Sequence, residues 1–237
     1  MKTTTKIVFG ITGALVIAVV ALAITARVSL ERVLTAGDGG EEVELTGTRV
    51  EREYDIRDFT EIEVHGGWQI SVRQAEEFAV GVGADEALID RITVEQDGDT
   101  LVVGSERWSW TNDAQLRLEV AVPRLSRLAV EGGAEVRLSG LDTESLEIEV
   151  DGAGDIQGVD ARIGELELQI DGAANVDFVE SRVRNADVSI SGAGEVALTM
   201  AGGELTGRIS GVGSVTYGGE VSRESVDIDG LGSVERR

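Results

Sequence analysis

The seven residues Ile190–Val196 read ISGAGEV, and close variants of them recur through the second half of the 237-residue chain. The other copies are VEGGAEV at Val130–Val136, VDGAGDI at Val150–Ile156, IDGAANV at Ile170–Val176, ISGVGSV at Ile209–Val215 and IDGLGSV at Ile228–Val234. Their starts lie 20, 20, 20, 19 and 19 residues apart. So regular a period is typical of a solenoid, whose repeats each pack only against their neighbours.

The residues before each copy alternate between apolar and polar, as in LEIEV at Leu146–Val150 and LELQI at Leu166–Ile170. Such alternation is typical of a β-strand with one buried face. A repeat of about 20 residues with many β-branched side chains is too short for a strand followed by a helix. The pattern therefore predicts an all-β fold, a single-stranded parallel β-helix whose strands pair with their copies in the neighbouring coils.

A flat sandwich of β-hairpins is the alternative fold. Its successive strands would alternate in direction, whereas the seven-residue copies all arrive in the same register, which favours the β-helix. The β-helix in turn predicts two inward-facing aliphatic ladders, one at each end of the repeated stretch. Their members are Val130, Val150, Ile170, Ile190, Ile209 and Ile228 in one ladder and Val136, Ile156, Val176, Val196, Val215 and Val234 in the other.

The third position of every copy is glycine. These residues are Gly132, Gly152, Gly172, Gly192, Gly211 and Gly230. Because glycine alone adopts a positive φ without a clash of its Cβ, we expect a coil corner with one fixed backbone shape at this position.

The N-terminus, residues 1–26, is predicted to be a signal anchor. Lys2 and Lys6 precede an uncharged run over residues 7–26, and 20 helical residues span about 30 Å, the thickness of a bilayer core. The alternative is a cleaved signal peptide, because Ala21-Leu22-Ala23 resembles a cleavage site. Residues 27–47 are predicted to be a flexible linker.

The β-helix domain is predicted to cover residues 48–237. The regular repeats occupy 126–237, and residues 48–125 are predicted to form irregular coils and a cap, because a bare terminal coil would expose strand edges and core. In this first part, His65 and Gly66 occupy the second and third positions of a looser copy of the repeated stretch.

The composition excludes several classes of function. The chain has no cysteine, so it forms neither a disulfide nor a thiolate site. Its formal net charge is −23, which repels nucleic acid. No cofactor motif is present, and we expect no cofactor.

Three stretches together resemble a known family, the putative auto-transporter adhesin head domain, or GIN domain, over about residues 48–237. They are FTEIEVHGGWQISV at Phe59–Val72, VAVPRLSRLAVEGGAEV at Val120–Val136 and the serial copies of ISGAGEV. The resemblance implies a right-handed β-helix-like fold in exported or surface proteins of bacteria, and it brings no catalytic residue. The chain departs from the family in its predicted membrane anchor and its lack of a lipid-attachment cysteine.

An enzyme is not expected. His65 is the only histidine, so a Ser-His-Asp triad would have to use it, and no nucleophile-elbow sequence is present. We expect His65 to be a solvated or structural corner residue. Many β-helices act on polysaccharides, so a carbohydrate-binding or polysaccharide-cleaving protein remains the alternative function.

Two groups of residues are candidate binding sites. Trp68, Trp108 and Trp110 could form a contact platform for a sugar or protein, or they could close the open end of the β-helix. Glu131, Asp151 and Asp171 should stack at one coil edge, where like charges would lie about 5 Å apart. Ca²⁺ could relieve their repulsion, but the interleaved Ser191, Ser210 and Asn175 favour a solvated acidic edge without an obligatory metal.

The sequence thus predicts a non-enzymatic β-helix of adhesin-head type that acts by binding or contact in the bacterial cell envelope. Residues 7–26 would hold it in the cytoplasmic membrane with residues 48–237 on the extracytoplasmic, periplasmic side. If the signal were cleaved, the product would be secreted or lie at the cell surface. The expected partners are an envelope protein or a glycan.

Overall fold

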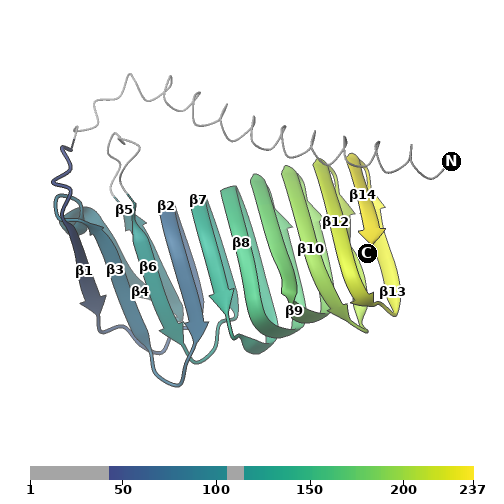
Figure 1. Cartoon of the computed structure of the whole chain (residues 1–237), viewed down its shortest axis with the longest axis horizontal. Helices are drawn as coiled ribbons and strands as arrows, with labels where there is room; N and C mark the ends of the chain where they lie inside the picture. The colour runs from purple at the N-terminus through teal and green to yellow at the C-terminus, as the bar shows by residue number, and fades with distance from the viewer. Residues whose placement is uncertain (1–42, 106–114) are drawn as a thin grey trace. The chain divides into compact units, whose positions relative to one another are not determined.

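A computed structural model describes residues 43–105 and 115–237. The described chain is almost entirely β-strand, with one short 3-10 turn, η1, at Ile89–Arg91 (Figure 1). The strands are β1 (Arg49–Tyr54), β2 (Glu61–Gln74), β3 (Ala79–Asp85), β4 (Ile92–Asp97), β5 (Thr100–Ser105), β6 (Arg117–Val122), β7 (Arg127–Ser139), β8 (Asp142–Ile170), β9 (Ala173–Ile190), β10 (Ala193–Ala201), β11 (Glu204–Ile209), β12 (Val212–Glu220), β13 (Arg223–Ile228) and β14 (Leu231–Arg236).

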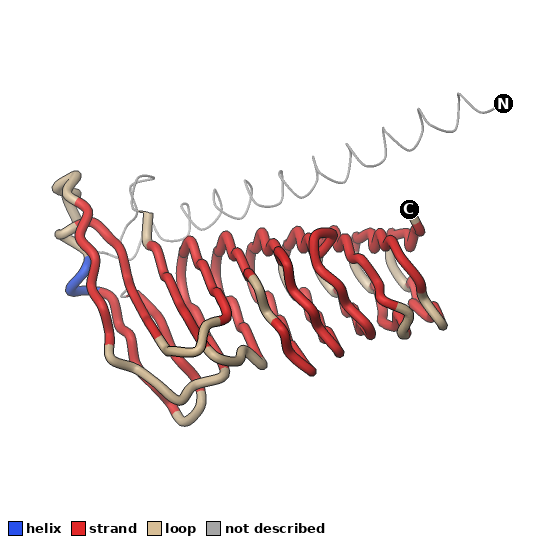
Figure 2. Tube along the Cα trace, turned by 60° about the horizontal axis from the view of Figure 1, so that its bottom comes forward, coloured by secondary structure: helices blue, strands red, loops and turns tan. Residues whose placement is uncertain are grey.

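The strands form two runs that face each other across the core. One run has the order β1-β3-β6-β2-β7-β8-β9-β10-β12-β14. The second contains β4, β5, β11 and β13 together with the first half of β2 and parts of β7, β8 and β9. The long strands β2, β7, β8 and β9 belong to both runs because they continue through a corner, so each coil crosses from one run to the other (Figure 2).

The pairing between coils is parallel and follows the sequence repeat. Val130 pairs with Val150, Ile170 with Ile190 and Val196 with Val215, so each copy of the repeated stretch lies beside the next copy in the same register. The prediction of an all-β parallel solenoid is therefore confirmed, and the sandwich of hairpins is excluded for the repeats.

The two predicted aliphatic ladders are also confirmed. From Val130 to Ile209 the members of the first ladder are at most 1% exposed, and from Val136 to Val215 those of the second are at most 3% exposed. In the last coil described, Ile228 pairs with Ile209 on one side only and is 42% exposed. Burial of each aliphatic side chain contributes roughly 1.5–3 kcal/mol, so the stack of coils supplies the core that a single coil lacks.

A positive φ explains only two of the six corner glycines. Gly132 and Gly152 have φ of +125° and +148°, but Gly172, Gly192, Gly211 and Gly230 have no φ in the left-handed region. The prediction of one shared backbone shape based on positive φ is thus wrong for these four.

Close stacking of the backbone is the constraint that all six glycines share. A Cβ on Gly192 would lie 1.8 Å from the carbonyl oxygen of Gly172 in the preceding coil. The other five meet the glycine carbonyl of their own preceding coil at 1.9–2.4 Å. The same carbonyl of Gly172 accepts a hydrogen bond of 2.8 Å from the backbone N–H of Ala193. A side chain at the corner would therefore push apart coils that the ladder holds together.

The N-terminal end of the domain is built differently from the repeats. β1 and β3, β3 and β6, and β4 and β5 pair antiparallel, while β2 joins this end to β7 through a parallel ladder. Leu88 and Ile89 around η1 are buried there, and the rings of Phe59 and Phe78 lie 5.2 Å apart. The antiparallel strands and these side chains cover the first coil.

The predicted membrane anchor at residues 7–26 lies outside the described residues. Within 43–105 and 115–237, no helix has the length and apolar character needed to cross a membrane.

The corner contact predicts the effect of Gly192→Ala. The new Cβ would overlap the Gly172 carbonyl, and we expect a loss of unfolding free energy of at least about 1–3 kcal/mol, the usual range for overpacking. Gly218→Ala is the matched control, because its Cβ would meet nothing within 4 Å and should change stability by less than about 0.5 kcal/mol. Urea unfolding of both variants measures the difference. Equal stabilities would show that the corner does not limit stacking.

Candidate functional site

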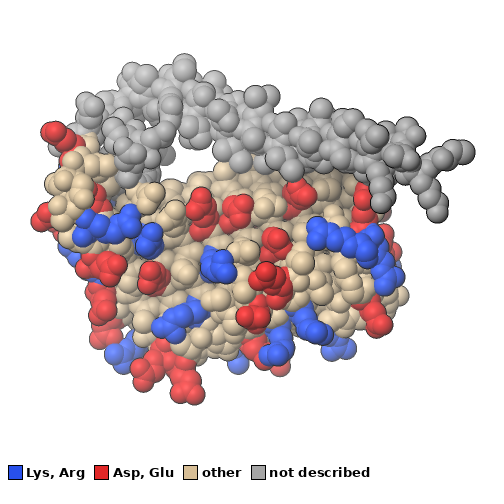
Figure 3. Space-filling model, viewed as in Figure 1, with Lys and Arg blue, Asp and Glu red and all other residues tan. Residues whose placement is uncertain are grey.

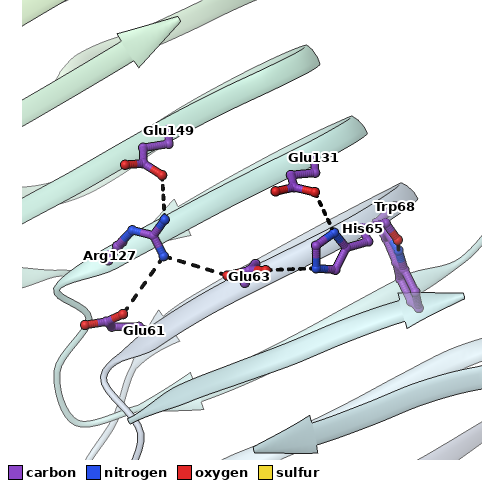
Figure 4. Close-up of polar contacts among 7 residues, drawn as sticks. All are labelled: Glu61, Glu63, His65, Trp68, Arg127, Glu131 and Glu149. Carbon is purple, nitrogen blue, oxygen red and sulfur yellow. Dashed lines mark hydrogen bonds and ion pairs between the residues drawn. The ribbon is translucent and has the colours of Figure 1, made fainter. Parts of the chain in front are cut away.

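A row of charged side chains crosses the outer surface of β2, β7 and β8 close to the glycine corner (Figure 4). Glu61, Glu63 and His65 alternate along β2, so all three point to the same outer face. The parallel register places Arg127 beside Glu61 and Glu131 beside His65. Residues 66 positions apart in the sequence thereby become direct neighbours.

His65 lies between two carboxylates. Its Nε2 is 2.9 Å from Oε1 of Glu63, and its Nδ1 is 2.9 Å from Oε2 of Glu131. The backbone is fixed at the same point, because Nε1 of Trp68 donates a hydrogen bond of 3.0 Å to the carbonyl oxygen of His65. Among residues 43–105 and 115–237, the groups that face the two ring nitrogens are carboxylates, and neither is a hydroxyl group that the imidazole could activate as a nucleophile.

Arg127 lies at the centre of the second part of the cluster. Its guanidinium donates to the carboxylate of Glu149, and it lies 3.9 Å from Glu63 and 4.0 Å from Glu61. Burial alone would lower the pKa of Arg127, but the hydrogen bond and charge of Glu149, with the charges of Glu147 and Glu61, raise it. The guanidinium therefore remains charged and offsets repulsion among these carboxylates.

Glu147 shows that this surface carries an excess of negative charge. Its pKa is raised, first by burial and then by the hydrogen bond and charge of Glu149, with a further contribution from Glu167. Arg127 acts in the opposite direction and lowers the pKa of Glu147.

The acidic residues of the coil edge lie on neighbouring coils. Glu131 and Asp151 are paired in register. Asp171 accepts hydrogen bonds from Ser191 and from Gln169, which lower the pKa of its carboxyl in that order. In the described part of the chain, Glu131, His65 and Glu63 lie close enough together to hold a metal ion, whereas Asp151 and Asp171 belong to no such group.

The predicted tryptophan platform is only partly within the described residues. Trp68 is 3% exposed and packs in the core, opposite Ala134 of the next coil. Its ring therefore has almost no surface to offer a ligand, and it fills space where the later coils carry smaller residues. Trp108 and Trp110 lie outside the described residues.

A shallow polar groove of about 650 Å³ lies on the other run of strands, over β6, β2, β7 and β8. Its polar lining includes Gln69, Arg117, Glu135, Arg137, Asp155 and Gln157, and the residues that line it include no aromatic side chain. Two of its hydrogen bonds join neighbouring coils, from Gln69 to Glu135 and from Arg137 to Gln157. The sequence did not predict this groove, because β6 lies beside β2 through strand pairing in the irregular N-terminal region and not through the repeat.

Charges of both signs are distributed over the solenoid. Figure 3 shows arginine side chains interspersed among acidic side chains on the face that it displays. Stacked side chains also supply partners for one another between coils, as Asn175 does for Asp155 at 3.3 Å. The outer surface thus consists of ordered polar columns on a rigid backbone.

The cluster around Arg127 predicts a pH-dependent effect of Arg127→Gln. The variant leaves Glu61, Glu63, Glu147 and Glu149 without their central cation. We therefore expect the unfolding free energy to fall by about 1–3 kcal/mol at pH 7. A raised folded-state pKa at Glu147 means that repulsion is present at neutral pH and is relieved as the pH falls through that pKa. The loss should therefore shrink near about pH 4, where carboxylates begin to bind protons.

Urea unfolding at both pH values measures this effect. Arg137→Gln is the control, because Arg137 is exposed and donates to the uncharged Gln157. A loss for Arg127→Gln that is the same at both pH values, or no larger than the control, would contradict the assigned role.

Comparisons with known proteins agree with this architecture. A crystal structure of a putative adhesin from Bacteroides fragilis superposes with a TM-score of 0.62 at 17% identity, covering 83% of this chain and 100% of the other. A putative adhesin from Parabacteroides distasonis matches over 83% of this chain and 100% of its own, at 16% identity and a TM-score of 0.42. The likeness to the Bacteroides fragilis structure supports the fold.

No functionally curated protein sequence matches the chain significantly. The family model described as "Putative auto-transporter adhesin, head GIN domain" matches residues 58–220, which include every coil from β2 to β12. The chain therefore belongs to the auto-transporter adhesin head (GIN) domain family.

Proposed function

We propose that the protein is a non-enzymatic binding module of the bacterial cell envelope, which makes contact through the outer faces of its solenoid. The observation that carries this proposal is the register of the coils, which fixes polar side chains in ordered columns on a rigid support. Binding surfaces gain affinity when their contact groups are held in place before the partner arrives.

The polar groove over β6, β2, β7 and β8 is the surface that best fits a partner. Arginine, amide and carboxylate groups line it, and they donate and accept hydrogen bonds as hydroxyl-rich ligands require. We infer that a glycan or a polar protein segment of the envelope binds there. The lining of the groove contains no aromatic side chain on which a sugar ring could stack, as it does in carbohydrate-processing sites. This favours binding through polar contacts over carbohydrate processing.

The surroundings of His65 support a function without catalysis. Both ring nitrogens face carboxylates, so in the described part of the chain neither is placed to act as a general base toward a hydroxyl group. Carbohydrate cleavage by two carboxylates is the alternative, because Glu119, Glu135 and Asp155 line the groove.

Membrane attachment through residues 7–26, with a right-handed solenoid on the extracytoplasmic side, completes the proposal. The uncharged run is long enough to span a bilayer, and the net charge of −23 is unsuited to nucleic-acid partners. Membership of an adhesin head family supports a location in the envelope or outside the cell.

A binding screen with the full-length chain tests this function. We expect a glycan or envelope-protein ligand whose binding is weakened about tenfold or more by Arg137→Ala in the groove, while Arg208→Ala on β11 leaves binding unchanged. Fractionation of expressing cells, with mass spectrometry of the mature N-terminus, should find the intact chain in the membrane. Ligand turnover would overturn the non-enzymatic role, and a soluble product lacking residues 7–26 would overturn the anchor.

A further inference from the structure

A neutral imidazole at His65 could not donate a hydrogen bond to both of the carboxylates beside it. An ionised carboxylate only accepts hydrogen bonds, and a neutral imidazole has one N–H and one lone pair. Glu63 and Glu131 lie at 2.9 Å from the two ring nitrogens, so one of these pairs brings a lone pair toward a carboxylate oxygen. A positive charge between or beside the two atoms is required, either as a second proton or as a metal ion.

We propose that this corner binds a divalent transition-metal ion of the Zn²⁺ class. Nδ1 of His65 and the carboxylate of Glu131 are the protein ligands, and water fills the remaining positions. Imidazole nitrogen with carboxylate oxygen is a donor set that suits Zn²⁺ and its neighbours, whereas Ca²⁺ and Mg²⁺ prefer oxygen alone. The site differs from the Ca²⁺ edge considered from the sequence, since it uses Glu131 with His65 and not with Asp151 and Asp171.

The surroundings distinguish the two carboxylates. Glu131 has a side chain that is 60% exposed, which leaves space for an ion and its water. Glu63 is 30% exposed, and its other oxygen lies 3.9 Å from the guanidinium of Arg127, which would repel a cation bound there. Glu63 is therefore a positioning residue that accepts the Nε2–H of His65 and holds the ring with Nδ1 toward the ion. A carboxylate in this role commonly accompanies a metal-binding histidine.

The backbone holds the ligands in place before an ion arrives. His65 and Glu131 are direct partners in the parallel ladder between β2 and β7, which keeps their side chains on one face. The indole of Trp68, itself buried, binds the carbonyl of His65. Ligands on two fixed strands lose little freedom when the ion binds, and the neighbouring acidic side chains attract it.

The ion would connect the irregular first coil to the first regular repeat. It is an addition to a fold that the aliphatic ladders already stabilise, so the domain forms without it. The inference goes beyond the proposed binding function and does not depend on it, because ligand binding in the groove and metal binding at the corner are measured separately.

Titration calorimetry with Zn²⁺ on the full-length chain without a polyhistidine tag tests the site. We expect one ion per chain, lost in His65→Gln and in Glu131→Gln. Glu63→Gln should weaken binding by about 10–100-fold, as is usual when an orienting carboxylate is removed. Glu195→Gln is the control, because it makes the same chemical change on β10 at a distant coil and should leave binding unchanged.

Two further readouts keep the result interpretable. Circular dichroism spectra should be the same for all variants, because the changed side chains point outward. The chain has a single histidine, so its imidazole ¹⁵N resonances are unambiguous, and Zn²⁺ should shift the Nδ1 resonance strongly.

The proposal fails if wild type does not bind Zn²⁺, or if His65→Gln binds it with unchanged affinity and stoichiometry. The proposal also fails if the ¹⁵N resonances show that both ring nitrogens carry a proton and if Zn²⁺ does not shift these resonances. That result would show an imidazolium held between two glutamates.

Discussion

The carbonyl oxygen of one corner glycine lies where the side chain of the next corner residue would have to be. A Cβ at Gly192 would lie 1.8 Å from the carbonyl oxygen of Gly172, and that carbonyl accepts a hydrogen bond from Ala193. Coils separated by the spacing of paired strands, about 4.8 Å, leave no room for a side chain that points along the stack. The parallel ladders, the two aliphatic columns and the register of the outer surface all depend on this close contact.

The corner also determines what lies on the outer surface. The corner stays paired from coil to coil, so the residues before and after it keep a constant register. Equivalent positions of successive repeats therefore lie beside one another. Stacked acids would repel one another, and the chain separates or pairs them with Ser191, Asn175 and Arg127. At β2 and β7 the same register brings His65 and Glu131 together, although 66 residues separate them. The candidate site is thus a consequence of coil stacking and needs no loop of special shape.

The period of 19 or 20 residues predicted the architecture because it sets both the pairing partners and the inward face. The ladder from Val130 to Ile209 follows directly from it. The reason for the corner glycines was predicted only in part, since a glycine that recurs in every repeat does not distinguish a positive φ from a close backbone approach. Trp68 could not be placed from the sequence, because its burial depends on how the irregular strands cover the first coil.

The charged cluster was predictable in principle from one clue. His65-Gly66 aligns with Glu131-Gly132 in the repeated stretch, which makes His65 and Glu131 neighbours if the first coil stacks on the second. The contacts of Arg127 required the structure, since the register places Arg127 beside Glu61 and Glu147, whereas its guanidinium binds Glu149. The polar groove depends in the same way on β6, which pairs with β2 outside the repeat.

Distances between spin labels test the parallel stack most directly, and the chain has no cysteine to interfere with labelling. Glu135 and Ser214 occupy the same outward position four coils apart, and Glu135 and Ser233 occupy it five coils apart. Pulsed dipolar EPR on the two doubly labelled chains should give mean distances of about 19 and 24 Å, one strand spacing apart. Equal distances, or a longer distance for the pair that includes Ser214, would contradict parallel stacking of coils in register.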